Sequence, residues 1–132
     1  MEHLSIAMEH YLETVYELSA AQQGCRVSDI AAQLQVSKAS AHSAMDVLSA
    51  KGLVQNEKYR QVVLTDEGLL LARLLSQKHA ILQCLLTRVV GVDPLLANED
   101  ACAIEHVIST ETVQAISDFL SAQGLSLPAE EL

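Results

Sequence analysis

Residues 27–52 read VSDIAAQLQVSKASAHSAMDVLSAKG, and the fold can be worked out from this segment. Apolar residues recur at helical spacing over 27–34, so we predict a short helix there with Ser28 as its N-cap. After a three-residue turn, Ser37 is suited to cap a second helix over 38–50. A short helix, a tight turn and a second helix are the spacing of a helix-turn-helix.

The segment that follows is predicted to form a basic wing. Two short segments, 53–57 and 61–64, have the length of strands, and Lys58-Tyr59-Arg60 joins them. Such a hairpin can reach DNA phosphates while the helix beside it enters the major groove. We therefore predict DNA contacts from the second helix, its flanks and the tip of the wing: Arg26, Ser37, Lys38, Ala39, Ser40, His42, Ser43, Lys58, Tyr59 and Arg60. The alternative is an ordinary helical hairpin whose second helix faces solvent.

The charges are unevenly placed along the chain. A net charge of −9 is unusual for a protein that binds DNA. Residues 26–60, however, carry five of the eight basic residues and only three acidic ones, so the rest of the chain is strongly acidic. A modestly basic DNA face on an acidic body is consistent with carboxylates that bind a cation. Because the second helix is not strongly basic, DNA affinity should depend on dimerisation and on the wing.

The rest of the chain is predicted to be helical. Helices are expected at about 5–21, at 66–90 with Thr65 as the cap, at 94–108 with Pro94 at the first position, and at 110–122. The longest of them carries leucine on more than one face, which exceeds what a small winged domain can cover, so we predict a homodimer. The predicted fold class is mainly α. A winged helix-turn-helix DNA-binding domain over 1–65 precedes an all-helical metal-binding and dimerisation domain over 66–132.

Two segments far apart in the sequence each place metal-capable side chains on one helical face. Cys102, Glu105 and His106 lie at positions i, i+3 and i+4. His10 and Glu13 lie at i and i+3, so each set can converge on one point. Thiolate and imidazole suit a divalent transition metal better than calcium or magnesium. Taken singly, Cys102 would be a small buried residue. The whole set, in a chain that also has a predicted DNA-binding helix-turn-helix, indicates a metal sensor.

Six blocks occur in order along the chain: Met8-Glu9-His10-Tyr11-Leu12-Glu13, Arg26-Val27-Ser28-Asp29-Ile30-Ala31, Lys51-Gly52-Leu53-Val54, Glu57-Lys58-Tyr59-Arg60, Leu64-Thr65-Asp66-Glu67-Gly68, and Cys102-Ala103-Ile104-Glu105-His106-Val107-Ile108-Ser109. Together they resemble the diphtheria toxin repressor family of iron- and manganese-dependent regulators. The resemblance extends over about residues 5–122, and six ordered blocks make it specific. It implies metal-activated repression at operator DNA by a homodimer.

The resemblance also implies roles for single residues. The primary metal site would be formed by four of them: His10, Cys102, Glu105 and His106. Glu13 and His79 match ligands of the second site in manganese-type members, although His79 taken alone would be a packed or surface histidine. Residues 37–48 match the recognition helix.

The ligand set departs from both types within the family. Position 10 is usually Met in the iron type and Asp in the manganese type, and here it is histidine. Cys102 matches the iron type, whereas Gln83 and Asn98 stand where long iron-type members have a Glu and a His of an ancillary site. Two imidazoles, a thiolate and a carboxylate make a softer set than a manganese site. We predict Fe²⁺ as the preferred metal, with Zn²⁺ and Mn²⁺ as the alternatives.

The sequence does not predict an enzyme. It has no HExxH motif, and the alternatives to a metal-dependent repressor are a metal-independent winged-helix repressor and a small metal-binding hydrolase. No signal-peptide pattern is present, and the longest apolar run is far below the roughly 20 residues of a membrane span. We therefore expect a cytoplasmic protein without membrane contact, in which Cys25, Cys84 and Cys102 remain thiols.

Overall fold

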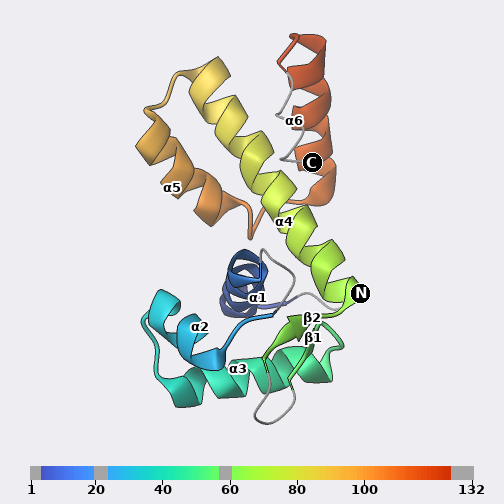
Figure 1. Cartoon of the computed structure of the whole chain (residues 1–132). Coiled ribbons are helices and arrows are strands. Elements are labelled where there is room, and N and C mark those ends of the chain that lie inside the picture. Colours follow the sequence, from blue (N-terminus) through green and yellow to red (C-terminus); the bar gives the residue numbers. More distant parts are fainter. Residues whose placement is uncertain (1–3, 20–23, 57–60, 126–132) are drawn as a thin grey trace. The chain divides into compact units, whose positions relative to one another are not determined.

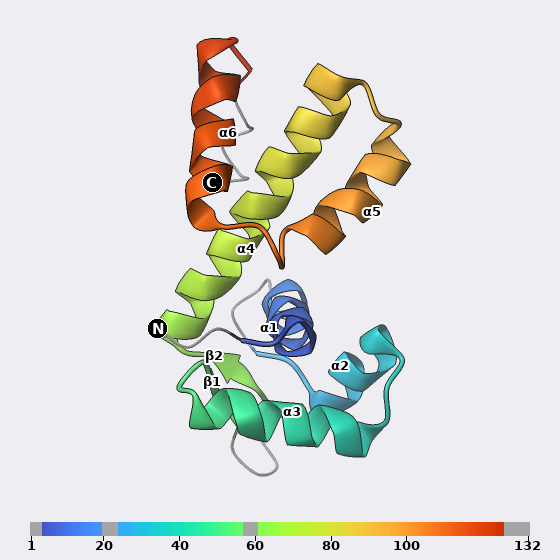
Figure 2. The ribbon, with the colours of Figure 1, turned by 180° about the vertical axis from the view of Figure 1, so that it is seen from behind.

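The computed structural model describes residues 4–19, 24–56 and 61–125 (Figures 1 and 2). The described chain forms two compact units, one within residues 1–72 and one within residues 73–132. The elements in chain order are α1 (Ile6–Leu18), α2 (Val27–Leu34), α3 (Lys38–Ala50), β1 (Val54–Gln55), β2 (Val63–Leu64), α4 (Asp66–Cys84), the π-helical segment η1 (Leu85–Val90), α5 (Pro94–Ile104) and α6 (Thr110–Ala122). Helix α4 crosses the division between the units, and the predicted domain boundary after residue 65 stays a prediction.

Of the three helices that lie wholly within the first unit, two begin at a serine cap. The hydroxyl of Ser5 accepts a hydrogen bond from a backbone N–H (3.2 Å) at the start of α1. The hydroxyl of Ser37 accepts one from the Ser40 N–H (3.0 Å) at the start of α3, as predicted. The prediction that Ser28 caps α2 is wrong, because α2 begins at Val27, its N-cap residue is Arg26, and no side chain caps it.

The core of the first unit is aliphatic and receives side chains from all three helices and from the wing. Helix α1 packs against both α2 and α3, and α2 packs against α3. The largest buried side chains are Leu12, Val15, Ile30, Met45, Leu48 and Val62. Ala31, Ala41 and Ala44 are also buried, and their small side chains allow the helices to approach closely. The predicted helix-turn-helix is thereby confirmed, with α1 packed against both of its helices.

The wing is a short antiparallel hairpin of β1 and β2, as predicted. The segment before α2 extends it, because the Cys25 N–H donates to the Val62 carbonyl (2.9 Å) and the Val62 N–H donates to the Cys25 carbonyl (2.7 Å). Gly24 has a φ of +87°, and a Cβ there would lie 2.8 Å from the Val62 carbonyl oxygen, so this position requires glycine. The predicted wing tip, Lys58-Tyr59-Arg60, lies outside the described residues.

Thr65 joins the wing to the start of α4. Its hydroxyl donates to the Gly52 carbonyl (2.6 Å) and accepts from the Gly68 N–H (3.1 Å), which confirms the predicted N-cap. The backbone of Leu53 passes so close to Gly68 that an added Cβ would overlap the Leu53 carbonyl oxygen. The start of α4 is therefore fixed against the wing by a side-chain hydroxyl and by a glycine.

The second unit is built on the C-terminal half of α4. In both views this half of α4 lies between α5 and α6 (Figures 1 and 2). Ile81 and Cys84 from α4 pack with Val113 and Leu120 from α6 in a small core, and α5 contacts η1. The all-helical character predicted for this part of the chain is confirmed for the described residues.

Two predicted helices of the second unit end differently from the prediction. The helix predicted over 66–90 changes form after Cys84 and continues to residue 90 as a π-helix, where the Thr87 hydroxyl donates to the Gln83 carbonyl (2.8 Å). Helix α5 ends at Ile104, four residues earlier than expected. Two of the predicted metal ligands therefore lie at and after a helix end.

The segment Asp66–Val90 is long and apolar enough, by length and composition, to cross a membrane, with a mean hydropathy of 1.2. No such segment was expected from the sequence. A core helix of a water-soluble domain passes the same test. Lys78 and His79, near the middle of this segment, donate to or contact residues of the same unit, which is the behaviour of a helix inside a folded domain.

The Thr65 cap generates a prediction for stability. Thr65→Ala should lower the free energy of unfolding by about 1–2 kcal/mol, because the Gly68 N–H and the Gly52 carbonyl both lose their partner. Urea titration of the metal-free protein, followed by circular dichroism, would measure the loss. Thr65→Ser is the matched control, since it keeps the hydroxyl. Equal midpoints for the alanine variant and the parent protein would contradict this account of the junction.

Candidate metal centre

The end of α5 brings together three side chains that were predicted as metal ligands. Cys102 lies within α5, Glu105 is the C-cap residue and His106 follows it. Each offers one ligand atom, and these atoms lie within 4.8 Å of one another. One cation can therefore reach a thiolate, a carboxylate and an imidazole that belong to the same unit.

The Glu105 carboxylate is the most constrained member of this cluster. The residue is only 1 % exposed. Its Oε1 lies 2.8 Å from Nδ1 of His79, and its Oε2 is buried without a hydrogen-bond partner among the described residues. A buried carboxylate oxygen without a partner is costly, because it has lost water and gained nothing in return. The donor set and the unpartnered oxygen thus fit a divalent transition metal.

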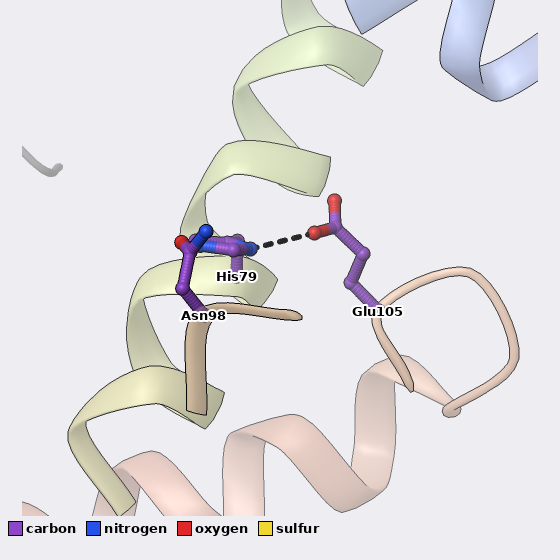
Figure 3. Close-up of polar contacts among 3 residues, drawn as sticks. All are labelled: His79, Asn98 and Glu105. Carbon is purple, nitrogen blue, oxygen red and sulfur yellow. Dashed lines mark hydrogen bonds and ion pairs between the residues drawn. The ribbon is translucent and has the colours of Figure 1, made fainter. Parts of the chain in front are cut away.

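His79 contacts two residues of the second unit through its two ring nitrogens. Nδ1 faces Glu105, and Nε2 lies 2.9 Å from Oδ1 of Asn98 (Figure 3). The hydrogen bond with Glu105 raises the pKa of His79 above its ordinary value, although burial acts in the opposite direction, and Asn98 adds to the rise. Both nitrogens therefore have oxygen partners in this arrangement.

Two residues that sequence reasoning did not assign hold the ligand-bearing turn in place. Asn98 contacts His79, and the Lys78 ammonium donates to the Ile108 carbonyl (3.1 Å) just after the cluster. Lys78 and His79 on α4 thus contact Glu105 itself and residues on both sides of it in the sequence, Asn98 before it and Ile108 after it. The run of polar residues Ser76-Gln77-Lys78-His79 within an otherwise leucine-rich helix was the available signal, but it did not identify the partners of Lys78 and His79.

His10 and Glu13 belong to the first unit and lie on α1. Their ligand atoms are within 4.8 Å of each other, as their spacing of three residues leads one to expect. Both side chains are half-buried, and the Thr14 hydroxyl donates to the His10 carbonyl (2.9 Å). The first unit therefore presents an imidazole and a carboxylate as a pair, and their role as metal ligands stays a prediction.

The predicted DNA-contacting residues of α3 lie on its exposed face. The exposed residues in this set are Arg26, Ser37, Lys38, Ala39, Ser40, His42 and Ser43. Ser37 also caps α3, so its hydroxyl has a structural role as well. Asp46, the acid on this face, accepts a hydrogen bond from the Asn56 amide of the wing (3.1 Å), which links α3 to the hairpin. Lys58, Tyr59 and Arg60 lie outside the described residues.

A winged helix-turn-helix and a metal-capable cluster in one chain define a metal-dependent transcriptional regulator. Residues 3–62 match the N-terminal DNA-binding domain of iron-dependent repressors, and residues 65–123 match their metal-binding and dimerisation domain. The chain is 35 % identical over 112 residues to the HTH-type transcriptional regulator MntR of Listeria monocytogenes, covering 85 % of this chain and 78 % of that protein. It is 36 % identical over 114 residues to MntR of Lysinibacillus sphaericus, covering 86 % and 81 %. The chain belongs to the iron-dependent repressor family.

Solved structures give the same fold. A hypothetical protein from Sulfolobus solfataricus, SSo2273, is 25 % identical with a TM-score of 0.75, covering 95 % of this chain and 99 % of that chain. The manganese regulator SloR is 28 % identical with a TM-score of 0.74, and ScaR with bound Zn²⁺ is 29 % identical with a TM-score of 0.76. The matches to SloR and ScaR cover 86 % of this chain but 53 % of those chains, so this chain spans about half of their length.

Family membership decides the class of function. Members are metal-dependent transcriptional repressors, and this chain has both the DNA-binding domain and the metal-binding and dimerisation domain. The protein is a regulator and not an enzyme, which confirms the prediction from the sequence. A divalent metal is its cofactor, and its partners are operator DNA and a second subunit.

The three thiols should differ in reactivity. Cys102 is half-buried, whereas Cys25 and Cys84 are buried, and burial is the main cause that raises the pKa of the Cys25 thiol. Since the thiolate is the nucleophile, Cys102 should react fastest with iodoacetamide in the metal-free protein. Zn²⁺ should slow that reaction by occupying the sulfur. Mass spectrometry of peptides sampled over time would measure both rates.

The control for this measurement is Cys102→Ser, which should lack both the fast reaction and the protection by Zn²⁺. Equal rates at all three thiols, with no effect of Zn²⁺, would count against Cys102 as a metal ligand.

Proposed function

We propose that this chain represses transcription when a divalent transition metal occupies a centre at the end of α5. Its ligands would be Cys102, Glu105 and His106, completed by His10 and Glu13. The observation that carries the proposal is the Glu105 carboxylate, which is buried and whose Oε2 has no hydrogen-bond partner among the described residues. A cation supplies the partner that such an oxygen requires.

Ligands on both units would make the centre a switch. His10 and Glu13 lie on α1 in the DNA-binding unit, and the cluster of Cys102, Glu105 and His106 lies in the other unit. When bound, the ion supplies a positive centre that both ligand sets can share. Shared ligation would restrict the arrangements that the recognition helices sample. Because this conformational entropy is lost when the metal binds, less is lost when DNA binds, and the affinity for DNA rises.

The reading of DNA is proposed to follow the helix-turn-helix pattern. Lys38, Ser40, His42 and Ser43 lie on the exposed face of α3, where small polar side chains can enter the major groove. Arg26 and the wing would contact phosphates. With few positive charges on this face, the second subunit of a dimer contributes much of the affinity at a two-fold symmetric operator. Repression of this kind takes place in the cytoplasm.

We propose Fe²⁺ as the activating ion, with Zn²⁺ and Mn²⁺ as the competitors to test. The fold alone does not separate these metals, since similar structures include a manganese regulator and a form with bound Zn²⁺. The ligand chemistry argues against manganese. The Cys102 thiolate, together with imidazole from His106, is softer than the oxygen-rich shell that manganese prefers.

Removal of the Glu105 carboxylate tests this function. Glu105→Ala should abolish metal-activated DNA binding, with a loss of at least about tenfold in affinity, while the protein remains a dimer. The assay is a gel shift under anaerobic conditions with Fe²⁺, Mn²⁺, Zn²⁺ or a chelator. The probe is a pool of duplexes that the Fe²⁺-loaded parent protein selects from random sequence.

Glu99→Ala is the matched control, because Glu99 is an exposed carboxylate on α5, the helix at whose end Glu105 lies. It should keep activation by metal. Retained activation in Glu105→Ala would contradict the proposed centre, and equal DNA affinity of the parent protein with metal and with chelator would select a metal-independent repressor.

We propose that the second subunit covers an apolar surface formed by η1 and α5. These elements contact each other, and Val89, Val90, Leu95 and Leu96 on them are 44 %, 62 %, 79 % and 51 % exposed. So many large aliphatic side chains on adjacent elements are unusual for a monomer. The matched metal-binding and dimerisation domain includes both elements, which supports a second copy of this chain as the occupant.

A charge in the middle of this surface should separate the subunits. Leu95→Asp should cost about 2 kcal/mol or more of dimer stability, because burial of an unpaired carboxylate is unfavourable. Sedimentation equilibrium of the metal-loaded protein would measure the dissociation constant. Ser121→Asp, at an exposed position of α6, should leave it unchanged. An unaltered dimer in Leu95→Asp would place the interface elsewhere.

A further inference from the structure

His79 lies between two partners that occupy both of its ring nitrogens. Nδ1 is 2.8 Å from Oε1 of Glu105, and Nε2 is 2.9 Å from Oδ1 of Asn98. Figure 3 shows the contact between the ring and the Glu105 carboxylate as a dashed line, and it shows the Asn98 side chain against the same ring. His79 lies on α4, Asn98 lies on α5, and Glu105 lies at the end of α5. The three side chains therefore join α4 to the ligand-bearing turn.

This arrangement distinguishes the two oxygens of Glu105. Oε1 is engaged by His79, whereas Oε2 is buried and has no hydrogen-bond partner among the described residues. A carboxylate held in this way offers a single oxygen to an ion. Hydrogen bonds from a neighbouring ring fix the orientation of a metal-ligating carboxylate and strengthen its binding.

A ring with both nitrogens hydrogen-bonded has no nitrogen left for a metal. To become a ligand, His79 would have to leave Glu105 or Asn98. Leaving Glu105 would add a second unpartnered oxygen to a residue that is 1 % exposed. Leaving Asn98 would remove the contact that fixes the ring. The Lys78 bond to the Ile108 carbonyl (3.1 Å) holds the same turn against α4, which opposes a rearrangement.

We propose that His79 is a positioning residue and not a ligand: Asn98 fixes the ring, the ring fixes Glu105, and Oε2 is the oxygen that ligates the ion. The centre then holds one ion per subunit. This inference rests on the proposed metal centre, and it gives His79 a role different from the second-site ligand that the family resemblance implies. Asn98, on the exposed side of the ring, becomes a determinant of metal affinity.

The test is a Co²⁺ titration of the whole 132-residue chain in its metal-free form, under anaerobic conditions, followed by calorimetry and by absorption. Calorimetry gives the number of ions per subunit and their affinity. The thiolate-to-cobalt absorption reports whether Cys102 has bound. The variants are His79→Ala and Asn98→Ala, and the matched control is Glu99→Gln at the neighbouring exposed position of α5.

The parent protein should bind one Co²⁺ per subunit and show the thiolate absorption. His79→Ala and Asn98→Ala should still bind one Co²⁺ with the thiolate absorption, but about 10- to 100-fold more weakly. The control should bind like the parent. Thermal melting of the metal-free variants separates positioning from folding, because a purely structural role would lower the melting temperature and leave the Co²⁺ affinity unchanged.

Three results would overturn the inference. Two ions per parent subunit that fall to one in His79→Ala would make His79 a ligand. Unchanged Co²⁺ affinity in both variants would remove its positioning role. Absence of Co²⁺ binding to the parent protein would overturn the inference together with the proposed metal centre, so this failure is distinguishable from the other two.

Discussion

The second unit depends on the contact between His79 and Glu105. It holds a carboxylate in the interior, where an isolated charge would be expensive, and it satisfies only one of the two oxygens. The other oxygen remains beside a thiol and an imidazole whose ligand atoms lie within 4.8 Å of that carboxylate and of each other. The interior is thus arranged for an ion that completes it.

In the DNA-binding unit, backbone contacts fix the position of the wing. The wing is held by contacts to the segment before α2 and to the start of α4. Cys25 and Val62 exchange backbone hydrogen bonds, and Thr65 and Gly68 fix the start of α4 against the hairpin. The outer face of α3 is exposed, and the hairpin lies next to this helix, where the Asp46 carboxylate accepts a hydrogen bond from the Asn56 amide. A repressor needs both properties, since the helix reads bases and the wing reaches phosphates.

The sequence predicted what depends on local spacing. The helix-turn-helix, the Ser37 and Thr65 caps and the convergence of Cys102 with Glu105 and His106 all follow from residues a few positions apart. Contacts over longer separations were not predictable in this way. The contact of His79 with Glu105 joins residues 26 positions apart, and that with Asn98 spans 19.

Local exceptions also escaped prediction. Gln35 adopts a left-handed conformation at φ 56°, which side-chain spacing does not signal, and α5 ends at Ile104 although the pattern continues. The central claim, that Cys102 and Glu105 ligate one ion, is tested most directly by X-ray absorption at the zinc edge of the Zn²⁺-loaded protein. We predict one sulfur scatterer at about 2.3 Å with nitrogen and oxygen scatterers at about 2.0–2.2 Å. A shell of nitrogen and oxygen alone would contradict the account.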